Sequence, residues 1–169
     1  VTEPKPVSIH MTLDSIAVLD MNNELSIRMF GETECLKVNE VVSCASNSSR
    51  YVIVQSDSSV YEMSSNGQKK MKVFGIGGTP VSCFAGSKHY GAITYEGNCY
   101  TWGWGINGQL GDGKFMNSSK PVRVNLDDST KVIAAAGGSE SSLFLVVKES
   151  SFTPQFPKIM LKHDYIKTV

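Results

Sequence analysis

Three histidines and four cysteines are the side chains of this 169-residue chain best suited to act as a base, a nucleophile or a metal ligand. The four cysteines form no Cys-x-x-Cys pair, the spacing typical of zinc sites; they are Cys35, Cys44, Cys83 and Cys99. No Gly-x-Ser-x-Gly segment marks a nucleophilic serine, and no cysteine is paired with a nearby histidine in a known pattern. The sequence therefore predicts neither a metal site nor a catalytic residue.

Phosphate binding would need a glycine-rich loop that leads into a helix. The segment GIGGT, residues 75–79, is rich in glycine but lacks the Lys-Ser/Thr ending and the following helix of such a loop. The carboxylates of Asp57, Glu96 and Asp112 fall in predicted turns or loops, where solvation explains them. We therefore expect no cofactor.

The composition describes a folded chain without charge bias. About 41% of the residues are apolar and 19% are charged, which is typical of a folded domain. Lys and Arg total 16, as do Asp and Glu, so the formal net charge is zero. No apolar run reaches the roughly 18 residues needed to span a bilayer. We expect neither a nucleic acid nor a membrane as a partner.

An internal repeat organises most of the chain. VSC occurs at 42–44 and again at 81–83, and with this shift of 39 residues SRYVIVQSDSSVY (49–61) aligns with KHYGAITYEGNCY (88–100) without a gap. A shift of 35 residues aligns VSI at 7–9 with the first VSC, and a shift of 51 aligns VIAAAGGSESSLFLV (132–146) with VSCFAGSKHYGAITY. The copies therefore start near residues 7, 42, 81 and 132.

Each copy has the pattern of four short strands separated by turns. Two apolar strands are followed by a tight turn, for which we expect hairpins near Asn22-Asn23, Ser58-Ser59 and Gly97-Asn98. A third strand comes next, and a fourth carries a basic residue beside valine, as in LKV, MKVF and PVRV. Four strands per unit at a period near 40 residues predict an all-β fold, a partial β-propeller of about four blades.

The segment WGWGINGQLGDG (102–113), followed by KPVRV and VIAAAGGSESSLFLV, resembles the repeat of the regulator of chromosome condensation family. The resemblance is specific from about residue 81 to 147. The matching signature residues are Trp102, Gly103, Gly108, Gln109, Leu110, Gly111 and Gly113, with His89 at the family's histidine position. Gly105 replaces the usual asparagine, and the first 66 residues keep the strand spacing but not the signature.

The resemblance implies structural roles for the signature residues. His89 is expected to hydrogen-bond neighbouring turn backbone rather than act as a base, and the ring of Trp102 is expected to cover backbone between blades. Ala17, Val52, Gly91 and Ser142 share one register in the repeat, so their side chains are expected to point to the same side of their blades.

Members of this family form seven-bladed propellers, which four copies cannot close. We expect the remaining blades upstream, on another chain or missing. The first residues, VTEPKPVSIH, lack an initiator Met and the shape of a secretory signal, so we expect a piece of a longer or processed chain in the cytoplasm or nucleus. Residues 1–153 are assigned to the propeller repeats. Residues 154–169 either end the last blade, with strands at 150–153 and 157–161, or form a linker to a following domain.

Two functions are open at this point. The first is a non-enzymatic protein–protein interaction platform. The alternative, implied by the resemblance, is part of a guanine nucleotide exchange factor for a small GTPase. The segments 28–37, 66–79 and 114–120 differ most between the copies and are the expected contact regions. Within or beside them, the predicted partner-binding residues are Lys69, Lys70, Phe74 and Phe115.

Overall fold

A computed structural model describes residues 5–152 of the chain. It contains β-strands and one short 3₁₀ turn, η1 (Glu149–Ser151). The strands are β1 (Pro6–Met11), β2 (Ser15–Asp20), β3 (Leu25–Met29), β4 (Leu36–Val38), β5 (Val41–Ser46), β6 (Arg50–Gln55), β7 (Val60–Ser64), β8 (Lys70–Val73), β9 (Pro80–Ala85), β10 (His89–Thr94), β11 (Cys99–Gly103), β12 (Ser118–Arg123), β13 (Thr130–Gly137) and β14 (Ser142–Lys148). Among the described residues, no helix has the length and apolar character needed to span a bilayer.

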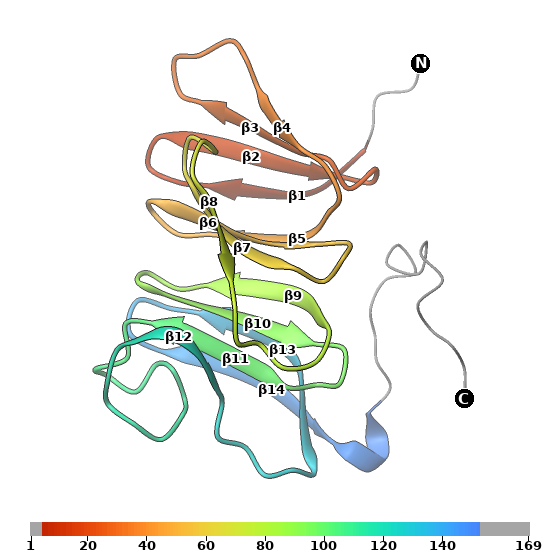
Figure 1. The fold of residues 1–169 in the computed structure, drawn as a ribbon, viewed down its shortest axis with the longest axis vertical. Coiled ribbons are helices and arrows are strands. Elements are labelled where there is room, and N and C mark those ends of the chain that lie inside the picture. The colour runs from red at the N-terminus through yellow and green to blue at the C-terminus, as the bar shows by residue number, and fades with distance from the viewer. Residues whose placement is uncertain (1–4, 153–169) are drawn as a thin grey trace.

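The strands form blades that follow one another along the long axis of the molecule (Figure 1). Three blades are four-stranded antiparallel sheets, β1–β4, β5–β8 and β9–β12, in which each strand pairs with the next. The described part of the fourth blade is the hairpin β13–β14. The predicted all-β partial propeller is confirmed. The segments LKV, MKVF and PVRV lie in or overlap the fourth strands of their blades, as predicted.

Tight turns between the second and third strands close the three four-stranded blades at the predicted places. Asn23, Ser58 and Gly97 have φ values of 62°, 63° and 79°, which is the left-handed region that such turns require. We call this end of the blades, which also carries the connections between blades, the connection face. The opposite end, which carries the loops between the third and fourth strands, is the loop face.

Apolar side chains fill the space between successive blades. Ala17 of the first blade packs against Tyr51 and Ile53 of the second. Val52, on the other side of β6, packs against Ala92 of the third blade. Strand β6 is therefore apolar on both sides, as a strand between two neighbouring blades must be.

The first turn of the fourth blade lies one residue later than predicted, which changes the direction of its side chains. In the third blade the turn hydrogen bond runs from the Gly86 N–H to the His89 carbonyl, and in the fourth it runs from Gly138 to Ser141, one residue later than a shift of 51 places it. Ser142 therefore points back toward the third blade, opposite to Ala17, Val52 and Gly91. The prediction that all four share one side is wrong for Ser142.

The segment after β14 also differs from one prediction. Residues 150 and 151 lie in the 3₁₀ turn η1, so the strand predicted for 150–153 does not begin there. The Glu149 N–H donates to the Ser129 carbonyl, which continues the β13–β14 pairing by one residue before η1. The strand predicted at 157–161 and the alternatives for 154–169 lie outside the described residues.

Candidate functional site

Two lysines lie on the outer strand of the second blade, above an aromatic ring. Lys70 and Lys72 alternate along β8 and share the side of the blade that carries Tyr61, which pairs with Lys72 on the neighbouring strand β7. The Nζ atom of Lys70 is 3.9 Å from the centre of the Tyr61 ring and donates to Gln55 Oε1 at 2.7 Å. Partial burial lowers the pKa of Lys70. None of Lys69, Lys70 and Lys72 forms a salt bridge within the described residues.

After β8 the chain crosses to the third blade through residues 74–79. Phe74 opens this connection with 72% of its side chain exposed, and Lys72 Nζ is 5.9 Å from its ring centre. Gly75 and Gly78 have φ values of 97° and 87°. The positive φ of Gly78 favours glycine, and a Cβ atom there would also displace the Glu96 carboxylate of the β10–β11 turn.

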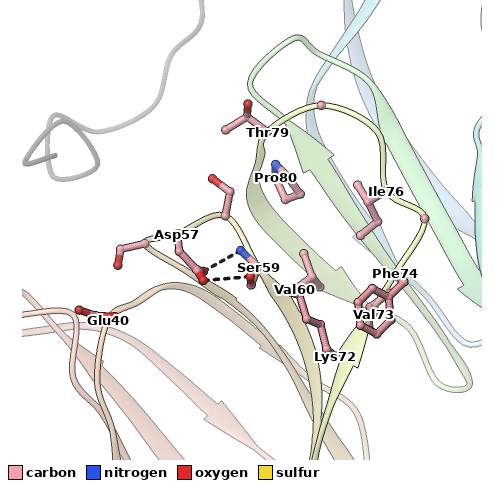
Figure 2. Close-up of a pocket in the computed structure, with 14 residues that line it drawn as sticks. Glu40, Asp57, Ser59, Val60, Lys72, Val73, Phe74, Ile76, Thr79 and Pro80 are labelled. Atoms are coloured by element: carbon pink, nitrogen blue, oxygen red, sulfur yellow. Dashed lines mark hydrogen bonds between the residues drawn. The ribbon is translucent and has the colours of Figure 1, made fainter. Parts of the chain in front are cut away.

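An open cleft of about 960 Å³ lies between this connection and the β6–β7 turn, on the connection face (Figure 2). Apolar side chains form its wall and carboxylates stand near its rim. Its lining includes Glu40, Asp57, Val60, Lys72, Val73, Phe74, Ile76, Thr79 and Pro80. A cleft of this kind suits an apolar side chain of a partner, flanked by polar groups that orient it.

Two carboxylates, Asp57 in the cleft and Glu96 beside it, are held by local hydrogen bonds. Asp57 accepts from the Ser59 N–H at 2.8 Å and from the Ser59 hydroxyl at 3.0 Å. The bond from the Ser59 N–H, with the hydroxyl bond and nearby lysines, lowers the pKa of Asp57. Glu96 Oε2 accepts from the Thr79 N–H at 3.0 Å. These bonds fix the two turns that border the cleft, but they assemble no acid–base pair.

The signature residues lie at blade interfaces and in the loop after β11. Trp102 is 2% exposed, and its Nε1–H donates to Glu62 Oε1 of the second blade at 2.8 Å. Leu110 and Gln109 are buried. The glycines of the signature have positive φ; they are Gly103, Gly108, Gly111 and Gly113. These residues order the loop and the interfaces, and they do not line the cleft.

His89 is buried between the third and fourth blades. Its Nε2 atom is 2.8 Å from Ser142 Oγ, and Nδ1 has no hydrogen-bond partner among the described residues. The predicted bond to neighbouring turn backbone is therefore wrong, because the one-residue offset in the fourth blade brings a serine hydroxyl to the ring. Burial lowers the pKa of His89.

The predicted partner-binding residues do not form one group. Lys69, Lys70 and Phe74 lie on or beside β8, whereas Phe115 lies on the loop face, in the loop between β11 and β12. Phe115 is 74% exposed, and the same loop exposes Trp104, which no prediction named. Sequence reasoning also missed Tyr61, although its position opposite Lys72 follows from the hairpin register.

The cysteines and the acidic residues offer no catalytic chemistry in the described part of the chain. Burial raises the pKa of the Cys83 and Cys99 thiols to about 12, so both stay protonated and unreactive at neutral pH. Within residues 5–152, no three His, Cys, Asp or Glu side chains gather as a metal ligand set.

Comparisons with known proteins agree with this architecture. Residues 96–145 match the regulator of chromosome condensation (RCC1) repeat. The ultraviolet-B receptor UVR8 of Arabidopsis thaliana is 33% identical over 67 residues, which cover 40% of this chain and 15% of the relative. The chain thus carries a repeat of this family.

Two solved structures share the fold. Human WBSCR16 superimposes with a TM-score of 0.73 at 16% identity, over 86% of this chain and 45% of that one. Prp20p of Saccharomyces cerevisiae, whose structure was described with its binding to Gsp1p and histones, superimposes with a TM-score of 0.68 at 16% identity, over 93% of this chain and 46% of that one. The chain spans about half the length of these structures.

Proposed function

We propose that this chain, which carries the regulator of chromosome condensation repeat in a partial propeller, is a non-enzymatic platform for binding another protein. The observation that carries the proposal is the cleft beside β8, where the exposed ring of Phe74, the lysines of β8 (Lys70 and Lys72) and an apolar wall meet. Exposed aromatic residues beside a concave apolar surface are common anchors of protein interfaces. Lys69, Lys70 and Phe74 are the proposed contact residues.

The absence of a catalytic arrangement among the described residues supports binding as the function. The histidine of the signature is buried in a blade interface, and three of the four cysteines are buried. The carboxylates of Asp57, in the cleft, and Glu96, beside it, each hold a turn through a backbone N–H. No described group is both exposed in the cleft and activated by a neighbour for proton transfer or attack.

A second candidate is part of an exchange factor for a small GTPase. It is favoured by the shared fold with Prp20p, whose structure was described with its binding to Gsp1p. At 16% identity this likeness shows the fold alone, and no residue of this chain is matched to an exchange mechanism.

The test compares two exposed phenylalanines on opposite faces. Phe74→Ala and Phe115→Ala remove rings of similar exposure, 72% and 74%, from the connection face and the loop face. On the platform proposal, a protein captured from lysate by the wild-type chain is lost with Phe74→Ala and retained with Phe115→Ala. A capture that both variants retain equally contradicts the proposed site.

Fluorescent-nucleotide release from a panel of small GTPases separates the two functions. The platform proposal expects release at the spontaneous rate for every GTPase. Acceleration by about a hundredfold or more on one GTPase would establish exchange activity, because it corresponds to a barrier lowered by about 3 kcal/mol, which passive binding does not provide.

A further inference from the structure

Strand β8 is the outer edge of the second blade and has an unpaired side. It pairs with β7, and no strand lies beyond it among the described residues. The Ser64 N–H donates to the Lys69 carbonyl, so Ser64 and Lys69 are a hydrogen-bonded pair. Because such pairs alternate along an antiparallel ladder, the backbone groups of Lys69, Met71 and Val73 face β7. The backbone groups of Lys70 and Lys72 therefore point to the open edge.

The side chains at this edge are sorted by face. Lys70 and Lys72 lie over Tyr61 on one face of the blade, and Met71, which is 44% exposed, lies on the other. The two lysines are two residues apart on one strand, so their side chains lie on the same face of the sheet. On any strand added beside β8, they therefore lie next to alternate residues, whose side chains are on that same face. Neither forms a salt bridge within residues 5–152.

The other outer strands of the described blades differ at the corresponding places. In β4, Lys37 Nζ is 2.7 Å from Glu24 Oε1, so its charge is already paired. In β12, Pro121 lacks a backbone N–H, and Arg123 donates to Asn98 Oδ1. Strand β8 is thus the described outer strand that combines outward backbone groups with two lysines that form no salt bridge, although Asp57 lies near enough to feel their charge.

We propose that β8 binds an extended acidic segment of a partner protein by strand addition. Acidic side chains at alternate positions of that segment lie opposite Lys70 and Lys72, and the side chain between them is apolar and lies beside Met71. Main-chain hydrogen bonds to Lys70 and Lys72 supply affinity, and the charge pairs supply register and specificity. This inference rests on the proposed function, because it names the kind of partner that the β8 surface takes.

The cleft extends this surface beyond the end of the strand. Phe74 follows Val73 directly, and both line the cleft with Ile76 and Pro80. A segment paired with β8 reaches the cleft at Phe74, where its next apolar side chain is seated. The proposed recognition pattern is therefore acidic–apolar–acidic, with a further apolar residue at one end.

The test uses a fluorescein-labelled short peptide of alternating Glu and Val and measures anisotropy with the 169-residue chain. The Glu–Val peptide is expected to bind, with an affinity that falls as salt is raised. Peptides of alternating Lys and Val, and Glu–Val peptides with N-methylated backbone amides, are expected to bind at least about tenfold more weakly. The first reverses the charge, and the second keeps the charge but removes the strand hydrogen bonds.

Variants of the chain complete the test. Lys70→Glu with Lys72→Glu is expected to weaken Glu–Val binding about tenfold or more, since two attractive cross-strand pairs become repulsive. Lys120→Glu on β12 changes the net charge by as much as Lys70→Gln with Lys72→Gln together, so it is the net-charge control for that pair and should leave binding within about twofold. Lys70→Gln with Lys72→Gln gives a neutral comparison, and circular dichroism checks that each variant is folded.

Several results would overturn the proposal. These are no binding of the Glu–Val peptide, equal binding of its N-methylated form, or equal losses with Lys120→Glu and with the paired Lys70 and Lys72 changes. If Phe74→Ala still abolishes capture of the lysate partner while the peptide does not bind, strand addition fails and the platform proposal stands. If Phe74→Ala has no effect on capture, the proposed site itself fails.

Discussion

Trp102 shows how one residue joins two blades. Its indole is buried in the interface with the second blade, 6.1 Å from the Tyr90 ring, and its N–H donates to Glu62, which also binds Arg50. We expect Trp102→Ala to lower the free energy of unfolding by about 3–5 kcal/mol, the usual cost of emptying a buried aromatic site. Chemical denaturation followed by circular dichroism measures this loss.

Trp104 is the matched control for that change. It lies two residues later, is 37% exposed and contacts Lys88 across its ring at 5.2 Å. Trp104→Ala is expected to cost less than Trp102→Ala, because 37% of Trp104 is already exposed against 2% of Trp102. Equal losses for the two tryptophans would show that Trp102 is not a principal support of the interface.

His89 makes stability depend on pH. Burial lowers its pKa below the value of about 6.5 that a histidine has in an unfolded chain. The unfolded chain then binds more protons in acid, so this contribution to stability is complete above pH 6.5 and is lost as the pH falls through the folded-state pKa. His10 acts in the same direction, because burial also lowers its pKa.

We expect the free energy of unfolding to decrease from pH 7 to pH 5 and to decrease less steeply in His89→Gln. Denaturant titrations at several pH values measure the slope, which is independent of any constant loss that the substitution causes. His10→Gln provides a second slope for comparison. A His89→Gln slope equal to that of the wild-type chain would contradict the assignment.

At the scale of the element, the connection 74–79 needs glycine for two separable reasons. Gly78 has a φ of 87°, and a Cβ there would meet the Glu96 carboxylate. Gly31 has the same φ of 87°, but nothing lies within 4 Å of its Cβ position. The two glycines therefore separate the strain of a left-handed backbone from the cost of the close approach.

Alanine substitutions at these two glycines test that separation. Gly31→Ala is expected to cost about 1 kcal/mol through backbone strain alone. Gly78→Ala is expected to cost more, and to weaken binding at the cleft, since Glu96 must move from the Thr79 N–H. Thermal unfolding and partner binding are the measurements, and equal effects of the two changes would contradict a role for the Glu96 contact.

The repeat pattern predicted the strands well because strand spacing and turn chemistry are local properties. The turns at Asn23 and Gly97 follow from residues that tolerate positive φ, and the turn at Ser58 from the Asp57 carboxylate that accepts from the Ser59 N–H. The register of Ser142 could not be predicted in this way, because one extra residue before the turn at Gly138 reverses which side chains face inward. The partner of His89 depends on that register and was missed for the same reason.

The candidate site was predicted only in part. Lys70 and Phe74 were singled out because their segment varies between copies, and the structure places both beside β8. Phe115 was grouped with them for the same reason, yet it lies on the loop face. Which end of a blade a loop occupies depends on strand order, and two variable segments can satisfy one sequence criterion while lying on opposite faces.

At the scale of the whole molecule, both end blades carry apolar residues on their outward sides. Ala17 faces the second blade, so on paired β1 the alternate residues Ile9 and Met11 face away, and they are 62% and 59% exposed. Phe144 packs toward the third blade, so Leu143 and Leu145 face away at 75% and 59% exposure. The outward sides of the two end blades are thus apolar, like the sides that successive blades bury against each other in the rest of the chain.

We therefore expect the 169-residue chain, produced alone, to associate through these sides or to bind the rest of its propeller when that is added. Exposed apolar patches of this kind are covered in stable soluble proteins, and a repeat array needs a polar or covered end.

Leu143→Glu with Leu145→Glu is expected to reduce self-association in sedimentation velocity and to reduce binding of an apolar-surface dye. Leu13→Glu is the control for changing one exposed leucine away from these sides, because Leu13 is 81% exposed but lies in the β1–β2 turn. A wild-type chain that sediments as a stable monomer and binds no dye would show that its end blades need no neighbour. Equal effects of the Leu13 change and the paired change would assign the association to general hydrophobicity rather than to the open side of the fourth blade.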